Sequence, residues 1–298
     1  MTLTVFDLFS GIGGFSLGLE RAGGYKTVAF CENDPASQKV LAKRWPDIPI
    51  FDDVRDTNAL ATVQADVLTG GFPCQDISIA GKNDGGIDGE KSGLWASYRD
   101  AIAAIRPRFA IVENVFALRS RGLDRVLGDL ASIGYDATYS LIHTQFMGSP
   151  QRRRRVYIVA CRDGLPAGAD LFDCAKRSQP YTAAKVAAIQ QRRERHIEEV
   201  EGTRSAPAFC SRLRSDFFAS SAVSSTLAKR DYKSYTDLVV HKNGVVRRVM
   251  PQERMALQGF PRDWLEGVDL PLTDQFRLNG MSVPVVQHIG ELINEKLL

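Results

Sequence analysis

The sequence has no apolar run of about 18 residues, the length that a membrane-spanning helix requires, so we expect no membrane segment. Internal repeats and low-complexity stretches are also absent, so repeat architectures are not expected. The first four residues lack the basic flank of a signal peptide and lead directly into a strand-like run. We therefore expect an unprocessed, soluble protein.

Cysteine is scarce, with five residues at positions 31, 74, 161, 174 and 210. They are odd in number, widely spaced and contain no CxxC pair, so neither a disulfide framework nor a zinc site is indicated. We expect reduced thiols, a cytoplasmic location and no bound metal.

The remaining composition is ordinary for a globular protein of 298 residues, with 44% hydrophobic and 24% charged residues. The net charge of +3 is unevenly spread. Residues 151–250 carry 20 Lys and Arg against 10 Asp and Glu, whereas residues 1–150 carry 14 against 18 and residues 251–298 carry 4 against 7. A basic block is either a solvated surface or a polyanion-binding face, and its concentration in one segment favours the second.

The chain opens with a strand, a glycine loop and a helix. Residues 4–9 form a short apolar run that ends in Ser-Gly-Ile-Gly-Gly-Phe at residues 10–15, and a helical pattern then continues to Gly23. This order is typical of a Rossmann unit, in which glycines let the backbone approach a ligand at the helix N-terminus. A purely structural turn is the alternative.

Acidic residues follow the next strand-like runs. Glu32 and Asn33 follow residues 27–31, at the distance from the glycine loop at which a carboxylate accepts hydrogen bonds from ribose hydroxyls. Asp53 and Val54 follow residues 48–51, and this acidic strand end is equally consistent with a contact to an adenine amino group and with a helix cap. Further along, Glu113 ends the apolar run 109–112.

A cysteine, Cys74, lies at the end of another strand-like run, residues 65–69, within Gly-Gly-Phe-Pro-Cys-Gln-Asp-Ile-Ser. A loop rich in Gly, Lys and Asp follows at residues 80–93. Ligands bind at this edge of open α/β sheets. On position alone, Cys74 is equally consistent with a small buried apolar residue.

Four consecutive arginines, residues 152–155, open the apolar run 156–160. They indicate either a nucleic-acid contact or a solvated edge. If the four alternate along a strand, Arg153 and Arg155 share one face and the other two share the opposite face. One pair would then point into a site.

Six segments, met in sequence order, resemble motifs of the DNA cytosine-5 methyltransferase family, of the bacterial or phage restriction–modification type. They lie at residues 7–15, 71–75, 113–115, 151–155, 248–261 and 280–283. The resemblance covers nearly the whole chain. It implies an α/β fold with a Rossmann-like S-adenosylmethionine-dependent methyltransferase sheet and a smaller, irregular target-recognition domain. It also implies transfer of a methyl group from S-adenosylmethionine to C5 of cytosine in DNA.

The resemblance implies the catalytic residues. The Cys74 thiolate would add to C6 of the cytosine, which makes C5 nucleophilic, as in other covalent catalysis by an activated nucleophile. Glu113 would contact N3 and the 4-amino group, Arg155 would support O2, and Arg153 would lie beside the nucleophile. The base must be flipped out of the duplex, and the loop 80–93 would close over it.

The resemblance also implies the residues that hold the cofactor. They are Phe9, Gly11, Ile12, Gly13, Gly14, Glu32, Asn33, Asp53, Val54, Pro73, Leu94 and Ser282. The closing motif departs from the family, because Met281 stands where relatives have asparagine. A thioether is only a weak acceptor, so we expect a somewhat weaker cofactor site, unless Asn279 replaces the missing amide.

The regular alternation of strands and helices stops near residue 164. We expect a catalytic domain of residues 1–164 with 281–298, whose amphipathic C-terminal pattern needs a partner, and a basic target-recognition domain of residues 165–280. The partner is double-stranded DNA, with Thr226 a candidate phosphate contact, and the recognised sequence stays open. We expect a monomer that works beside a cognate restriction endonuclease.

Three other interpretations compete. A tRNA cytosine methyltransferase would share the scaffold. A catalytically silent DNA-binding relative would not need Cys74, Glu113 and Arg155 together. A dinucleotide-dependent oxidoreductase would explain the glycine loop but neither the cysteine motif nor the arginines.

Overall fold

The computed structural model describes residues 1–73, 94–149, 151–165, 171–172, 208–214, 217–221, 224–227, 237–240 and 246–298. The chain forms two compact units. The first comprises Met1–Ile142, Arg154–Gln179 and Val286–Leu298, and the second comprises His143–Arg153 and Pro180–Val285. This division groups residues 143–153 with the second unit, whereas the sequence had suggested a boundary near residue 164.

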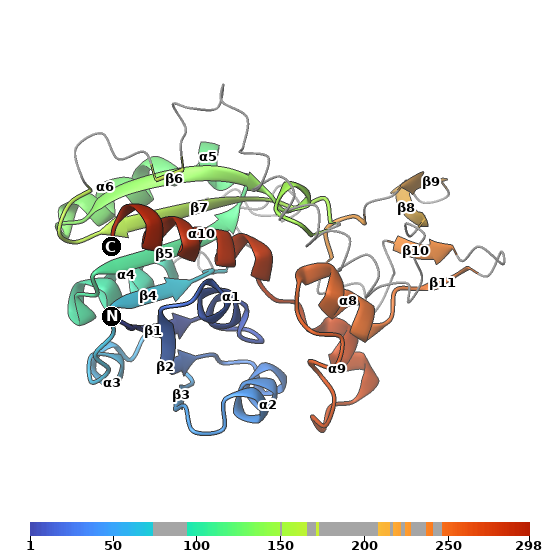
Figure 1. Ribbon diagram of the computed structural model, residues 1–298, viewed down its shortest axis with the longest axis horizontal. Helices are drawn as coiled ribbons and strands as arrows, with labels where there is room; N and C mark the ends of the chain where they lie inside the picture. The colour runs from blue at the N-terminus through green and yellow to red at the C-terminus, as the bar shows by residue number, and fades with distance from the viewer. Residues whose placement is uncertain are drawn as a thin grey trace. The chain divides into compact units, whose positions relative to one another are not determined.

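The first unit is built on a seven-stranded sheet with the order β3-β2-β1-β4-β5-β7-β6 (Figure 1). Its strands are β1 (Leu3–Leu8), β2 (Tyr25–Cys31), β3 (Ile50–Phe51), β4 (Val67–Gly70), β5 (Phe109–Val115), β6 (Asp136–His143) and β7 (Arg154–Cys161). β1 pairs in parallel with both β2 and β4, and β7 pairs antiparallel to β5. The direction of winding therefore reverses between β1 and β4, the point where α/β sheets bind ligands at their carboxyl ends.

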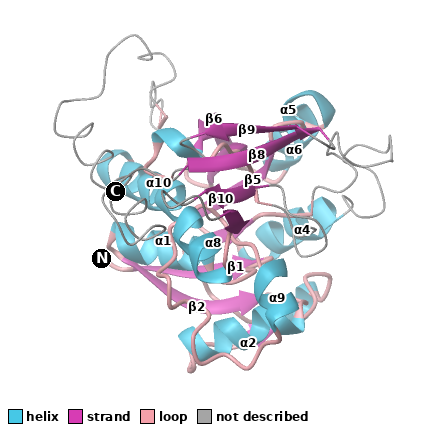
Figure 2. Cartoon of the chain, turned by 90° about the vertical axis from the view of Figure 1, so that its right-hand side faces the viewer, coloured by secondary structure: helices cyan, strands magenta, loops and turns pink. Residues whose placement is uncertain are grey.

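Helices cover both faces of this sheet, which explains why its central strands β1, β4 and β5 are buried along nearly their whole length. Figure 2 shows α1 and α10 on one side of the strands and α4 and α6 on the other. The helices of the unit are α1 (Gly14–Ala22), α2 (Pro35–Arg44), α3 (Thr57–Leu60), α4 (Leu94–Ile105), α5 (Leu118–Arg121), α6 (Leu123–Ser132) and α10 (Val283–Lys296), whose first three residues belong to the second unit.

The C-terminal helix α10 packs on the first βα unit of the chain. The Tyr25 hydroxyl donates a 3.1 Å hydrogen bond to the Gly290 carbonyl, and a Cβ at Gly290 would lie 2.7 Å from the Ala22 Cβ. The amphipathic pattern of the last residues thus finds its partner on α1.

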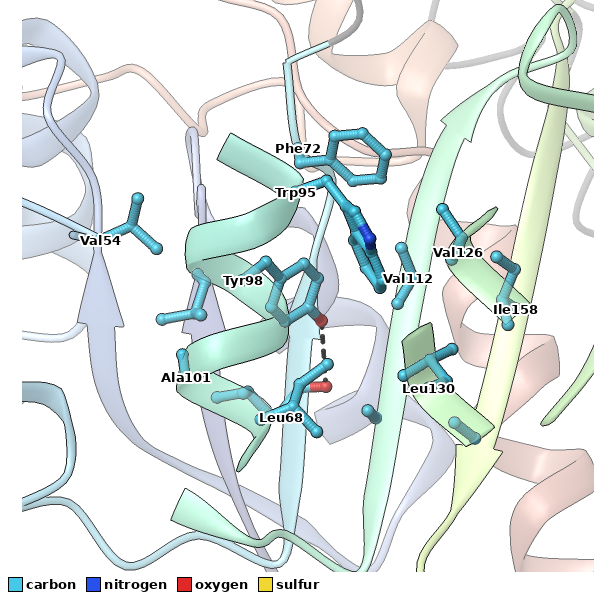
Figure 3. Packing of buried hydrophobic residues seen from close by; sticks show 14 of the residues in the cluster. Val54, Leu68, Phe72, Trp95, Tyr98, Ala101, Val112, Val126, Leu130 and Ile158 are labelled. Atoms are coloured by element: carbon cyan, nitrogen blue, oxygen red, sulfur yellow. Dashed lines mark hydrogen bonds between the residues drawn. The ribbon is translucent and has the colours of Figure 1, made fainter. Parts of the chain in front are cut away.

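The core on the opposite face is aromatic (Figure 3). Trp95 and Tyr98 of α4 lie against β4 and β5, with ring centroids 5.9 Å apart, and the Tyr98 hydroxyl donates to the carbonyls of Leu68 and Ile111. The same hydroxyl thus bridges two neighbouring strands. This fixes the spacing of the two strand ends that carry the candidate catalytic residues.

The second unit contains a four-stranded antiparallel sheet with the order β11-β10-β8-β9. Its elements are β8 (Ala208–Arg214), β9 (Phe217–Ser221), β10 (Asp237–Val240), β11 (Val246–Arg248), the 3-10 helix η2 (Thr144–Phe146), α8 (Pro251–Gln258) and α9 (Leu272–Arg277). Pro251 opens α8, and Gly259 ends it in the left-handed conformation at φ 87°. In the described residues, no helix is long and apolar enough to cross a membrane.

Candidate functional site

The glycine loop begins where β1 ends. Phe9 adopts φ 50°, a left-handed conformation that is uncommon for a residue other than glycine, and Gly11 and Gly13 follow at φ 54° and 83°. A Cβ at Gly13 would approach the Trp45 ring to 2.4 Å, so only glycine fits. Backbone strain of this kind persists where the surrounding structure enforces it, often at a ligand site.

Glu32 is fixed beside this loop. Its Oε2 accepts a 2.7 Å hydrogen bond from the Gly11 amide and its Oε1 accepts 2.8 Å from the Asp34 amide. Each carboxylate oxygen keeps a lone pair for another donor. The side chain is half-buried, and Asn33 next to it is exposed. The arrangement suits two neighbouring hydroxyl groups, such as those of a ribose.

A buried carboxyl group lies beneath the loop. Asp7 on β1 accepts 2.7 Å from the Thr69 hydroxyl of β4 and 3.2 Å from the Ser16 hydroxyl of α1. Burial raises its pKa to about 8, although these hydrogen bonds act in the opposite direction. Asp7 therefore joins the cofactor-type loop and helix to the strand that leads to Cys74, a role that the sequence pattern did not reveal.

The third acidic position is already engaged. Asp53 accepts from Arg55, with Arg55 Nε 2.9 Å from Oδ1 and Nη2 2.8 Å from Oδ2. This side-chain hydrogen bonding holds the pKa of Asp53 below its usual range. Val54 beside it is buried in the aromatic core. The chain thus offers an apolar side chain and a paired carboxylate at the position expected for an adenine contact.

The strand β4 leads to the nucleophile motif through Gly70. A Cβ there would lie 2.9 Å from the Tyr98 ring, so glycine lets α4 approach the strand. Phe72 follows and packs on Trp95, with ring centroids 5.5 Å apart. In the sequence, Pro73 follows Phe72, and Leu94, the first residue of α4, precedes Trp95. Cys74 and residues 75–93 lie outside the described residues.

At the end of β5, Glu113 and Arg155 form a largely buried ion pair, with Arg155 Nε 3.0 Å from Glu113 Oε1. Arg155 is opposite Val115 in the antiparallel ladder, which brings β7 to the end of β5. Asn114, also buried, donates 3.1 Å from its amide to the Phe72 carbonyl. These contacts hold the carboxyl ends of β4 and β5 together. Asn114 had carried no role in the sequence analysis, because an Asn between Glu and Val has no local signature.

The burial of the four arginines alternates as expected, with Arg153 and Arg155 the less exposed pair and Arg152 and Arg154 exposed, but the four do not lie on one strand. β7 begins only at Arg154, and the preceding backbone turns, with the Arg153 amide donating to the Gln151 carbonyl at 3.0 Å. The Arg153 carbonyl accepts from the Thr144 amide, and its side chain is buried within the second unit. Backbone contacts to the 3-10 helix, invisible in the sequence, interrupt the extended pattern there.

In the second unit, the arginine motif is tied to residues 224–227. The Arg152 amide donates to the Ser224 carbonyl at 2.7 Å, and the Thr226 hydroxyl donates 2.6 Å to the Arg152 carbonyl. Thr226 thus uses its proton on the protein backbone, which leaves its oxygen as an acceptor only. We therefore drop the expected phosphate contact of Thr226.

The closing motif also lies in this unit. Ser282 is buried, and its Oγ has no hydrogen-bond partner among the described residues. Asn279 donates 2.9 Å to the Leu227 carbonyl, and the Gly280 amide donates 2.7 Å to Gln258. The Asn279 amide nitrogen is therefore engaged within its own unit, whereas its buried Oδ1 has no hydrogen-bond partner among the described residues.

The residues expected at one site thus fall in two groups. The first unit brings together the loop 9–14, Glu32, Asp53, Pro73, Glu113 and Arg155 at the carboxyl ends of its strands. The second unit holds Arg153 and Ser282. Among the described residues, no group of three or more His, Cys, Asp or Glu side chains could hold a metal ion.

Comparison with known proteins gives one consistent result. The profile of the family described as C-5 cytosine-specific DNA methylase matches residues 3–203 and 173–295. Type II methyltransferase M2.BsuMI of Bacillus subtilis is 32% identical over 308 residues, which cover 98% of this chain and 76% of that protein. Type II methyltransferase M.HaeII of Haemophilus aegyptius is 31% identical over 302 residues, covering 97% and 92%.

Solved structures agree on the fold. The crystal structure of a mutant of Spodoptera frugiperda DNMT2 superposes with a TM-score of 0.73, at 14% identity, over 98% of this chain and 100% of that one. This likeness confirms the expected α/β fold with its Rossmann-like methyltransferase sheet.

Proposed function

The chain belongs to the C-5 cytosine-specific DNA methylase family, and from that premise we propose the reaction that it catalyses. It transfers a methyl group from S-adenosylmethionine to C5 of a cytosine flipped out of double-stranded DNA, through a covalent bond between Cys74 and C6. The observation that carries the proposal is the ion pair of Glu113 with Arg155 beside the strand that leads to Cys74.

The first unit suits S-adenosylmethionine. When bound, this cofactor supplies an electrophilic methyl group on a sulfonium. The glycine loop lets backbone approach the ligand, and the two fixed oxygens of Glu32 accept from the ribose hydroxyls. Val54 offers a buried apolar side chain on which an adenine ring would pack. The residues present therefore fit the cofactor.

Cys74 starts the reaction on the base. Its thiolate forms a bond to C6, and the electrons of the C5–C6 double bond move onto C5, which then takes the methyl group. Loss of the C5 proton and cleavage of the bond between sulfur and C6 restore the aromatic ring and the free thiolate.

Glu113 holds the base and moves a proton. Its carboxyl group contacts N3 and the 4-amino group, and protonation at N3 offsets the negative charge that the thiolate brings to the ring. Arg155 Nε lies 3.0 Å from Glu113 Oε1 and fixes the carboxylate, and the Arg155 guanidinium would contact O2 of the base. Both side chains are mostly buried, so water competes little with these hydrogen bonds.

The substrate is double-stranded DNA. Cytosine within a duplex hides C6 from a thiolate, so the base must leave the stack. The basic block of residues 151–250 supplies charge that suits phosphates, and this predicts affinity that falls steeply with salt.

One experiment tests the proposal directly. The purified protein is incubated with a mixed-sequence plasmid and S-adenosylmethionine, and the plasmid is then sequenced after bisulfite treatment. Protected cytosines within one recurring sequence would support the proposal and reveal the recognition site. A tRNA transcript serves as the second substrate; methylation of the transcript alone would refute the DNA assignment.

We further propose that the protein acts as a monomer. We also propose that it protects DNA against a cognate endonuclease, because relatives of the chain are named Type II methyltransferases. Analytical ultracentrifugation tests the first point. Resistance of the methylated plasmid to a restriction enzyme that cuts the protected sequence tests the second.

A further inference from the structure

Two arginines stack on one aromatic ring beside the candidate catalytic pair. The guanidinium carbon of Arg154 lies 4.0 Å from the centroid of the Phe116 ring, and that of Arg119 lies 5.5 Å from it. Phe116 follows the last residue of β5, three positions after Glu113, and Arg154 immediately precedes Arg155. All of these residues belong to the first unit.

Both guanidinium groups are exposed, and neither has a carboxylate partner among the residues that the structure describes. Six other described arginines of the first unit each lie within 4.0 Å of a carboxylate; they are Arg55, Arg99, Arg108, Arg125, Arg155 and Arg162. Arg119 and Arg154 therefore concentrate positive charge that no described carboxylate compensates.

Stacking prepares these groups for an anion. A guanidinium that lies over an aromatic face loses side-chain freedom but keeps its in-plane N–H donors for hydrogen bonding. The two distances to one ring place the cations within about 10 Å of each other, near the Debye length at physiological salt, so each raises the potential at the other. A phosphate between or beside them relieves this repulsion.

The position of the pair determines which phosphate it suits. Arg155 and Glu113 form the proposed base-holding pair, and Arg154 follows the strand alternation away from Arg155. A flipped nucleotide whose base contacts Glu113 carries its own phosphates about one nucleotide length away. We propose that Arg154 and Arg119, stacked on Phe116, bind the target-strand phosphates that flank the flipped cytosine; this rests on the function proposed above.

The test compares binding by Arg119→Gln, Arg154→Gln and the double variant with wild type. Fluorescence anisotropy measures affinity for duplex DNA containing the recognition site at several salt concentrations. Each lost phosphate contact lowers the slope of log K against log salt by about 0.9, so the double variant should lose about two slope units and bind at least tenfold more weakly at low salt. Arg125→Gln is the matched control, because Arg125 is exposed but pairs with Asp129 at 3.0 Å, and it should bind like wild type.

A methylphosphonate substitution locates the contact. Neutralising the phosphates beside the target cytosine should lower the affinity of the wild-type protein as much as the double substitution does. The methylphosphonate and the double substitution together should lower the affinity no more than either change alone. The same substitution one helical turn away should add to the effect of the double variant. An unchanged salt slope, or additive losses at the flanking phosphates, would overturn the proposal.

Binding and chemistry are read separately. If the wild-type protein binds duplex DNA and the variants show the expected slopes, but no cytosine is methylated, the phosphate-binding role of Arg119 and Arg154 is supported and the proposed reaction is refuted. If the double variant loses affinity for tRNA but not for DNA, the pair serves a different nucleic acid and the inference is wrong. Unchanged thermal midpoints establish that the variants are folded.

Discussion

The side-chain amide of Asn114 donates a 3.1 Å hydrogen bond to the backbone carbonyl of Phe72, two residues before Cys74. Asn114 is almost completely buried, and its Oδ1 accepts from the Val115 amide at 2.7 Å. The residue that follows the candidate acid thus fixes the backbone that leads to the candidate nucleophile. One hydrogen bond thus links the residue after Glu113 to the backbone at Phe72.

We expect Asn114→Ala to slow methyl transfer more than it weakens cofactor binding. The change leaves the Phe72 carbonyl without its donor, at a cost of about 1–3 kcal/mol in unfolding free energy, and loosens the approach to Cys74. Single-turnover kinetics and urea denaturation measure the two effects. Asn294→Ala is the control, because Asn294 makes a similar 2.9 Å bond to the Gly23 carbonyl far from Glu113. Equal rates in both variants would contradict a positioning role.

Glu113→Gln should lower the single-turnover rate by roughly 10²- to 10⁴-fold, the usual contribution of a positioned acid. A Glu113→Gln variant that turns over at the wild-type rate would exclude Glu113 from the chemistry.

Arg155→Ala should lower the free energy of unfolding by about 3–5 kcal/mol, because it removes the guanidinium that pairs with the buried Glu113 carboxylate. Calorimetric affinity for S-adenosylmethionine should change little in either variant.

The buried carboxyl group of Asp7 makes stability depend on pH. Its pKa rises from 3.8 to about 8 in the folded protein, so between these values the unfolded chain ionises while the folded one stays protonated. Stability contributed by Asp7 is therefore complete below pH 4 and is lost as pH rises to about 8, by up to about 1.4 kcal/mol per pH unit.

Asp7→Asn removes this titration. Denaturation between pH 5 and pH 9 should show a smaller fall in unfolding free energy for the variant than for wild type. Identical slopes would show that Asp7 is ionised in the folded protein across this range.

Two of the cysteines should resist alkylation in the native protein. Burial raises the pKa of the Cys31 thiol to about 12 and also raises that of Cys161, so neither forms the reactive thiolate at pH 8. Mass spectrometry after brief iodoacetamide treatment should find both unmodified. Cys74 should be modified in the free protein and protected when DNA is bound. Modification of Cys31 at the rate of the unfolded chain would contradict its burial.

The closing motif offers a gain-of-affinity test. Met281→Asn should tighten S-adenosylmethionine binding severalfold, because an amide adds a hydrogen bond worth roughly 0.5–1.5 kcal/mol. Asn279→Ala should instead destabilise the second unit, since Asn279 already donates to Leu227. Calorimetry and thermal melting separate the two effects. A large loss of cofactor affinity in Asn279→Ala, with no gain in Met281→Asn, would assign the role to Asn279.

The sequence by itself determined the elements whose causes are local. Glycines at positions 11 and 13 precede a helix, Pro251 and Gly259 bound α8, and the apolar runs before Glu32 and Glu113 become buried strands. Such features follow from backbone sterics and from periodicity, which a short stretch of sequence carries completely. The motif order also sufficed to identify the family.

Only the tertiary structure decided which side chains meet. Asp7 joins Thr69, Asn114 reaches Phe72, and Arg155 rather than Arg153 extends from the strand β7 toward Glu113. Arg153 and Arg155 are two positions apart and chemically identical, so their separation depends on where β7 begins. That point is set by the backbone hydrogen bond of Arg153 to the 3-10 helix nine residues earlier and by pairing with β5, a strand far from β7 in the sequence. Local sequence carries no record of such contacts, because their energy exists only once the chain has folded.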